Sequence, residues 1–280
     1  MVKTVTTING RFVEKTNARI SVFDNSLLYA EGLFETFLAV GDQPVFVDEH
    51  LDRLYRGAET IGLTIPADRD RLVEWMRRTL RRHPSRIKKL RLTATAGESA
   101  RWLGQQGKPQ VILSAAPHEL PTDPFRLLVS DFKVDHLSEF RQVKTISYAI
   151  NAAALREAHR RGYDDALLLN QRGNVAEVSS ANIFWIEDGR IHTPPCSAGC
   201  LEGVTRRIVL REARGLGMAI TEMKCPMTCL EQTKEVFISS SLKLIMPVGE
   251  IRSGRRRFRF KPGPVARELG EHFRKLAGVE

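Results

Sequence analysis

The chain has 280 residues, of which 42% are hydrophobic and 27% charged, a composition typical of a globular protein with one large or two ordinary domains. It has no apolar run near the roughly 18 residues of a membrane span and no apolar signal-peptide core, so we expect a cytoplasmic protein without a membrane partner. The net charge of +10 is compatible with nucleic-acid binding. However, the basic clusters lie on expected solvent faces, and no recognised nucleic-acid motif accompanies them.

The first 117 residues predict a small N-terminal α/β domain. Alternating residues on both sides of Asn9-Gly10 indicate a β-hairpin. Asp48 is expected to cap a helix over 49–63, and Arg53 lies off the apolar stripe of that helix. A turn is expected from Asp24, before the strands. The other expected elements are strands at 33–40, 45–47, 90–96 and 111–115 and a helix at 67–82 capped near Asp68.

Residues 118–124 are the best candidate linker, because prolines are dense there and no periodicity is present. A larger, strand-rich domain is expected over 125–280, which makes the chain a two-domain α/β (α+β) protein. Four short strand-like runs follow the first helix of this domain. The expected helices are 151–161, 204–216, 230–233 and 262–276, and the last strands are 235–239 and 246–251.

Two features between residues 143 and 206 indicate chemistry. Glycines precede a helix that opens with Val204 and Thr205, and the unpaired N–H groups of such a helix start can hold a phosphate. Lys144 stands alone in a mostly uncharged stretch, where a desolvated amine can form a Schiff base. Each feature also has a purely structural interpretation: the glycines can form a tight connection, and Lys144 can be a solvated surface lysine. Short motifs such as these have many false positives.

The four cysteines form two pairs, Cys196/Cys200 and Cys225/Cys229, each with three intervening residues. Two such pairs can form a tetrahedral zinc site, although structural zinc pairs more often have two intervening residues. We expect four reduced thiols and no metal. A non-enzymatic zinc-binding or nucleic-acid-binding protein is therefore the remote alternative to an enzyme.

Several separated segments fit one pattern when they are taken together. They are Phe34-Glu35-Thr36, Glu49–Leu54, Lys144–Tyr148, Arg161–Asn170, Gly173–Trp185, Thr193–Pro195 and Gly199–Arg206. In this order the chain resembles the class IV aminotransferases, which are fold-type IV pyridoxal-phosphate enzymes. That family includes branched-chain and D-amino-acid aminotransferases, (R)-selective amine transaminases and aminodeoxychorismate lyases. The resemblance covers essentially the whole chain, and it implies a homodimer and a cofactor held between the two domains.

The resemblance implies specific roles for the residues that match the family motifs. Lys144 matches the lysine that forms the internal aldimine and then moves a proton between the substrate α-carbon and the cofactor. Glu177 matches the carboxylate that pairs with the pyridine nitrogen, where a buried anion keeps that nitrogen protonated. The remaining cofactor contacts are Arg53, Ser241 and the amides of Val204 and Thr205 for the phosphate, Leu201 against the ring, and Tyr148 as a candidate for the phenolic oxygen.

The resemblance places the substrate contacts at Tyr29, Glu35, Arg91 and Arg101. Arg91 matches an arginine of branched-chain enzymes, whereas Arg101 matches one of D-amino-acid aminotransferases and some lyases, and Arg101 is favoured for the substrate carboxylate. Leu103 replaces the histidine of those D-enzymes, and Ser239–Pro247 is closer to the lyases. The expected function is transfer of an amino group between an amino acid or amine and a 2-oxo acid. The alternative is aminodeoxychorismate lyase, which eliminates pyruvate to give 4-aminobenzoate.

Overall fold

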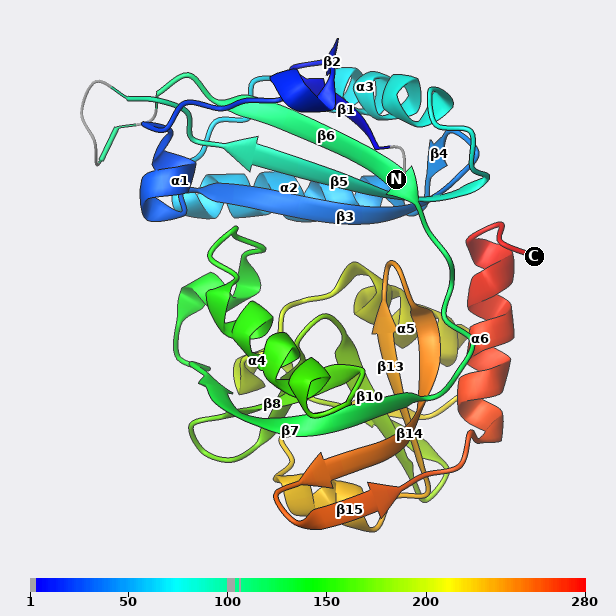
Figure 1. The fold of residues 1–280 in the computed structure, drawn as a ribbon. Helices are drawn as coiled ribbons and strands as arrows, with labels where there is room; N and C mark the ends of the chain where they lie inside the picture. The colour runs from blue at the N-terminus through cyan, green and yellow to red at the C-terminus, as the bar shows by residue number, and fades with distance from the viewer. Residues whose placement is uncertain (1–3, 100–103, 106) are drawn as a thin grey trace. The chain divides into compact units, whose positions relative to one another are not determined.

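The computed structural model describes residues 4–99, 104–105 and 107–280 of the chain (Figure 1). The chain divides into two compact units. The first contains residues 1–120, 143–147 and 277–279, and the second contains residues 121–142, 148–276 and 280. The division after Leu120 falls within the predicted 118–124 linker.

The first unit is a six-stranded antiparallel sheet with two helices packed on it. The strand order is β2-β1-β6-β5-β3-β4. Apolar side chains of both helices and of the sheet form one core that includes Leu51, Met76 and Leu90. The elements are β1 (Val5–Ile8), β2 (Arg11–Val13), α1 (Asn25–Tyr29), β3 (Gly32–Val40), β4 (Gln43–Pro44), α2 (Val47–Ile61), α3 (Arg69–Arg81), β5 (Ile87–Thr95) and β6 (Gln110–Pro117), with a short 3-10 turn at Lys15–Asn17.

The predicted Asn9-Gly10 hairpin is confirmed. Asn9 and Gly10 have φ values of 48° and 73°, which the tight turn between β1 and β2 requires. Gly10 is also needed for packing, because a Cβ there would lie 2.3 Å from the indole nitrogen of Trp75. The Asp68 cap of α3 is confirmed as well, since its carboxylate accepts the Arg71 N–H at 2.9 Å.

Three local predictions in the first unit are wrong. The turn expected from Asp24 contains helix α1, because the Asp24 carboxylate caps it through the Ser26 N–H at 2.8 Å. Helix α2 begins at Val47 after Phe46, which has a left-handed φ of 53°, so Asp48 lies in the first turn and is not the cap. An acidic residue in the first turn still suits the helix dipole. The expected strand at 45–47 is replaced by the two-residue strand β4.

Residues 143–147 pack with the first unit, although the sequence assigns them to the domain 125–280. They lie along the start of β3: the Phe34 N–H donates to the Lys144 carbonyl and the Ile146 N–H to the Gly32 carbonyl, both at 3.0 Å. These bonds satisfy backbone groups on a sheet edge. They also fix the backbone of Lys144 beside Phe34.

The second unit is built on a nine-stranded mixed sheet. Its order is β12-β11-β10-β13-β14-β7-β8-β9, with β15 paired to β14. Helix α4 packs on β7 and β8, and α5 and α6 pack on β13. The strands are β7 (Phe125–Val134), β8 (Asp165–Asn170), β9 (Val175–Val178), β10 (Asn182–Glu187), β11 (Arg190–Thr193), β12 (Ile220–Glu222), β13 (Glu235–Ser240), β14 (Leu244–Ser253) and β15 (Arg256–Arg259).

The helices of the second unit agree with the prediction except near residue 230. They are α4 (Ala149–Arg160), α5 (Val204–Gly215) and α6 (Pro264–Leu276), with 3-10 turns η2 (Glu139–Gln142), η3 (Cys196–Ala198) and η4 (Met227–Glu231). The helix expected at 230–233 is therefore a 3-10 turn that starts earlier. In the part of the chain that the structure describes, no helix has the length and apolarity needed to cross a bilayer.

Candidate active site

Lys144 lies against the aromatic ring of Phe34 in the first unit. Its Nζ is 4.2 Å from the ring centroid, and the guanidinium carbon of Arg91 is 4.0 Å from the same centroid. Phe34 is buried, Lys144 is half-buried and Arg91 is exposed. The ring therefore brings an amine and an exposed guanidinium to one place, and cation–π attraction favours both contacts.

Arg53, Glu35 and His50 form a buried charged cluster on the other face of β3, because successive strand residues point to opposite faces. Arg53 donates from Nε to Glu35 Oε1 at 2.8 Å and from Nη2 to Oε2 at 2.7 Å. His50 Nδ1 lies 2.6 Å from the same Oε2. Arg53 lies off the apolar stripe of α2, yet it is only 7% exposed, because Glu35 from β3 compensates its charge.

Burial and charge act in opposite directions on Glu35. Burial raises the pKa of its carboxyl, but Arg53 and His50 together outweigh burial and lower the pKa well below its ordinary value. Burial also lowers the pKa of His50, and the Glu35 charge offsets only part of this effect. The cluster is therefore an anion with one arginine cation and one neutral imidazole.

Stability is expected to fall on acidification in two stages. A lowered folded pKa means that the unfolded chain binds the proton first, so stability is present at high pH and lost as pH falls. Protonation of His50 causes the first loss of stability, which begins as the pH drops below the ordinary pKa of histidine, near 6.5. Protonation of Glu35 causes the second loss of stability, which begins as the pH drops below the ordinary pKa of its carboxyl, 4.5. Urea unfolding between about pH 2 and 8 measures both stages.

His50→Gln is the matched control, because it removes the titrating ring and keeps a donor for Glu35. The variant is expected to lose the pH dependence between about 5 and 7 and to keep the loss at lower pH. An unchanged profile in both ranges would show that His50 is not the group responsible.

The predicted substrate contacts Tyr29 and Glu35 differ in accessibility. Tyr29 ends α1 and is exposed. Glu35 is 0% exposed, and both of its carboxylate oxygens accept hydrogen bonds from Arg53 or His50. This arrangement suits Glu35 to orient Arg53, and it leaves no exposed atom for direct substrate contact. Arg101 lies outside the described residues.

Glu177 lies in β9 of the second unit and is 4% exposed, so its side chain is buried. Three donors from separate elements reach its carboxylate. Oε1 accepts from Arg141 Nη2 at 2.5 Å and Asn151 Nδ2 at 3.3 Å, and Oε2 accepts the Leu201 N–H at 2.8 Å. An ionised carboxylate has about four acceptor positions, so these three donors leave room for one more on Oε2.

Tyr148 precedes α4 and is half-buried. Its hydroxyl donates to the Ser179 carbonyl at 3.1 Å, and Asn151 Nδ2 donates to the same carbonyl at 2.9 Å. Asn151 therefore connects this carbonyl to Glu177. Sequence reasoning missed Asn151 and Arg141. The available signal for Asn151 was a polar side chain on the inner face of a helix.

The start of α5 fits an anion. Its cap is Gly203, which supplies no side-chain acceptor for the first N–H groups. A Cβ at residue 203 would lie 2.0 Å from Asn182 Oδ1, so a larger residue there would require the Asn182 side chain to move. The Thr205 hydroxyl is buried and has no hydrogen-bond partner among the described residues. A bound phosphate would supply acceptors for Thr205 and for the helix N–H groups. Ser241 lies in the turn after β13 and is half-buried.

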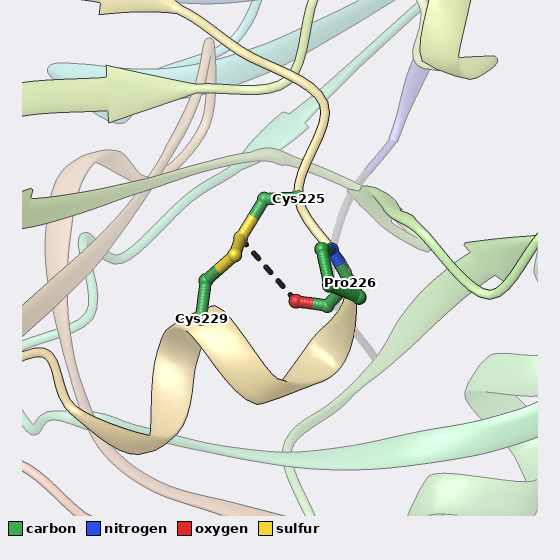
Figure 2. The surroundings of a disulfide bond; sticks show 3 residues. All are labelled: Cys225, Pro226 and Cys229. Carbon is green, nitrogen blue, oxygen red and sulfur yellow. Dashed lines mark hydrogen bonds between the residues drawn. A yellow bond between two sulfur atoms is a disulfide. The ribbon is translucent and has the colours of Figure 1, made fainter.

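The cysteines of the second unit are not equivalent. Cys225 and Cys229 form a disulfide, which Figure 2 shows beside Pro226, so the expectation of four reduced thiols is wrong. The turn η4 brings their Cα atoms to 6.0 Å, within the range that a disulfide spans. Cys196 and Cys200 are free. Within the described ranges, no cluster of three or more His, Cys, Asp or Glu side chains is arranged to hold a metal ion.

A lysine against an aromatic ring, a buried carboxylate held by three donors and a helix start open to an anion are features of an enzyme. The family description Amino-transferase class IV matches residues 32–251. The chain belongs to that family, as its sequence motifs predicted.

Relatives of known name cover nearly all of the chain. A Methanocaldococcus jannaschii protein, provisionally named a branched-chain-amino-acid aminotransferase, is 32% identical over 96% of this chain and 95% of its own length. The D-alanine aminotransferase of Staphylococcus epidermidis is 27% identical, covering 96% of each chain. The aminodeoxychorismate lyase of Bacillus subtilis is 28% identical over 87% of this chain and 85% of its own.

Solved structures confirm the predicted fold class. The branched-chain aminotransferase of Thermoproteus uzoniensis with norvaline has a TM-score of 0.90 and 28% identity, covering 99% of this chain and 95% of that one. A second branched-chain amino acid aminotransferase, complexed with N-(5'-phosphopyridoxyl)-L-glutamate, has a TM-score of 0.88 and 28% identity over 100% and 96% of the two chains. The chain therefore has the α/β fold of these aminotransferases, and it is an enzyme.

Proposed function

We propose that this aminotransferase uses pyridoxal 5'-phosphate to move an amino group between an amino acid and a 2-oxo acid. The observation that carries the proposal is the buried Glu177 carboxylate, which retains one acceptor position while three donors hold it. When bound, pyridoxal phosphate supplies an aldehyde that condenses with amines and a ring that withdraws electrons from the substrate α-carbon. Glu177 fits the task of facing the ring nitrogen, where a fixed anion stabilises its protonated form.

Lys144 is the residue proposed to attach the cofactor and to move the proton. Its amine is the nucleophile for the aldehyde carbon. With cofactor and substrate bound, the same amine would be the group that takes the proton from the substrate α-carbon and returns it at the cofactor C4′. The Phe34 ring at 4.2 Å restricts where the Lys144 amine lies. Restriction of this kind favours proton transfer between fixed positions.

The phosphate contacts are proposed for Arg53, Val204, Thr205 and Ser241. The buried Thr205 hydroxyl and the uncapped start of α5 support this assignment. Glu35 and His50 are proposed to hold Arg53 in the orientation that the phosphate needs, because two of its nitrogens are fixed by one carboxylate. Leu201 packing on the ring and the Tyr148 contact to the phenolic oxygen stay predictions from the resemblance.

Branched-chain amino acids are the proposed donors, supported by the 32% identical relative and by both solved structures. Aminodeoxychorismate lyase stays the second candidate, because the Bacillus subtilis relative is 28% identical and residues 239–247 resemble that group. Initial rates with L- and D-amino acids, (R)-amines and aminodeoxychorismate decide between them. Exclusive pyruvate release from aminodeoxychorismate would contradict the transaminase.

One arginine is proposed to bind the substrate carboxylate. The sequence favours Arg101, whereas the structure gives support to Arg91, which is exposed and shares the Phe34 ring with Lys144. Arg91→Leu is therefore expected to raise the KM for 2-oxo acids by about tenfold or more, since it removes a charge-assisted two-point contact. Steady-state kinetics with varied 2-oxo acid measure this effect, and the cofactor absorbance should be unchanged.

Arg101→Leu is the comparison variant for that experiment. If Arg101→Leu raises the KM and Arg91→Leu does not, the sequence-based assignment is correct and Arg91 is structural. Loss of the absorbance band in Arg91→Leu would indicate a role in cofactor binding instead.

A homodimer and a cytoplasmic location are also proposed. The dimer is supported by a run of exposed apolar side chains in the first unit, which a second copy would cover. The run consists of Ile20, Val22, Phe23, Leu27, Leu28 and Tyr29, each at least 38% exposed. The cytoplasmic location stays a prediction from the sequence.

A further inference from the structure

We propose that Arg141, which no motif singled out, is a positioning residue that holds Glu177 and the segment Gly199–Leu201 in one arrangement. The proposal rests on the proposed function, because it concerns the carboxylate assigned to the cofactor ring nitrogen. Arg141 lies in η2, whereas Glu177 lies in β9 and Gly199 follows η3. Its side chain is thus the connection between three elements that are distant in sequence.

The hydrogen bonds of Arg141 connect the Glu177 carboxylate to the backbone of residues 199–201, which also bonds to that carboxylate. Nη2 donates to Glu177 Oε1 at 2.5 Å, and Nε donates to the Gly199 carbonyl at 3.0 Å. Two residues further along, the Leu201 N–H donates to Glu177 Oε2 at 2.8 Å. The guanidinium and the carboxylate therefore each hold the other and also hold the same backbone segment. A rotation of Glu177 would break a bond at both of its oxygens.

The guanidinium is suited to this position, because its donors point in fixed directions within one plane. A lysine ammonium on a flexible stem restores the charge but does not fix both acceptors in that plane. The Arg141 side chain is 20% exposed and that of Glu177 is 6%, so water screens this pair less than it screens a surface pair. Charge-assisted hydrogen bonds of this kind are roughly twice as strong as neutral ones.

The neighbouring residue strengthens the attachment of the same segment. Gln142 Nε2 donates to the carbonyls of Cys196 and Cys200, each at 3.2 Å. Residues 141 and 142 together hold the backbone from residue 196 to residue 200. This backbone leads to Gly203 and the phosphate-binding start proposed for α5. Arg141 is the one of the two that also contacts the carboxylate, so its loss is expected to change chemistry as well as backbone order.

The test compares Arg141→Gln, Arg141→Lys and the control Arg161→Gln in the full-length chain. Arg161 is a suitable control, because its exposed side chain pairs at 3.2 Å with another buried glutamate of the same unit, Glu157. Hydrogen exchange without cofactor is the first readout. The amides of residues 199–203 are expected to exchange about tenfold faster in Arg141→Gln, less so in Arg141→Lys and at the wild-type rate in Arg161→Gln.

Single-turnover transfer from a saturating amino donor to bound cofactor is the second readout. Arg141→Gln is expected to react at least about tenfold more slowly, with cofactor affinity within about threefold of wild type and partial recovery in Arg141→Lys. Unchanged exchange in a folded Arg141→Gln would overturn the proposal, as would faster exchange with an unchanged rate. If Arg141→Gln does not fold, the same criteria apply to Arg141→Lys.

Failure of the proposed function would look different. In that case the wild-type chain would show no cofactor absorbance and no amino transfer. The exchange experiment contains no cofactor, so it would still decide whether Arg141 holds the segment. An absorbing, active wild-type enzyme with an indifferent Arg141 would overturn only the present inference.

Discussion

Lys144→Ala is expected to abolish the visible absorbance of the bound cofactor and to lower turnover by about 10³-fold or more, because its amine is proposed to serve both as attachment point and as proton carrier. The proposed phosphate contacts involve other residues, so the variant should still retain cofactor weakly. Absorbance spectra after gel filtration, together with single-turnover rates, measure the two losses separately. The melting temperature should change little, since Lys144 is half-buried at the edge of β3.

Lys89→Ala is the control for this experiment. Lys89 is an exposed lysine on β5 in the same unit. Its removal should leave both spectrum and rate unchanged. An intact absorbance band in Lys144→Ala would assign cofactor attachment to another lysine.

Glu177→Gln is expected to slow amino transfer by about 10²–10³-fold, or roughly 3–4 kcal/mol at tenfold per 1.36 kcal/mol. The substitution keeps the shape of the side chain and removes the charge that is proposed to stabilise the protonated ring nitrogen. It also places an amide donor among the donors Arg141, Asn151 and Leu201, so some loss of stability is expected. Single-turnover rates and thermal unfolding, measured on the same sample, separate the two effects.

Glu177→Asp provides the matched comparison, because it keeps the charge on a shorter side chain. It should lie between wild type and Glu177→Gln in rate. Equal rates for wild type and Glu177→Gln would show that the carboxylate serves only the fold. Equal losses in both variants would indicate that the position of the group matters more than its charge.

Most regular elements could be predicted from local pattern. The helices at 69–81 and 204–215 and the strand at 32–40 have strong periodicity, and their ends were placed within two residues. The start of α2 was less predictable, because Phe46 adopts a left-handed conformation that its residue type disfavours. The location of residues 143–147 on β3 depends on a pairing between distant segments, which local periodicity does not contain.

The candidate site was predictable where a residue belongs to a motif and unpredictable where it acts through a distant partner. Lys144, Glu177, Thr205 and Arg53 were proposed from the motifs of their segments, and their roles stay predictions. The burial of Arg53 was not predicted, because the carboxylate that compensates its charge, Glu35, lies 18 residues away on another element. Arg141 was missed for the same reason, being 36 residues from Glu177. The disulfide was also missed. The expectation of reduced thiols was based on the expected cytoplasmic compartment, whereas the disulfide depends on the turn that brings Cys225 close to Cys229.

The buried cluster of Glu35, His50 and Arg53 also restricts how this sequence can change over generations. Each of the three side chains is tolerated in the interior because the others compensate it. Replacement of Glu35 or Arg53 alone leaves a buried charge without its partner, which typically costs about 3–5 kcal/mol, a large part of the stability of an ordinary domain. Such energies are strongly non-additive between contacting residues. Glu35 and Arg53 are therefore expected to be kept together or replaced together in descendants of this sequence.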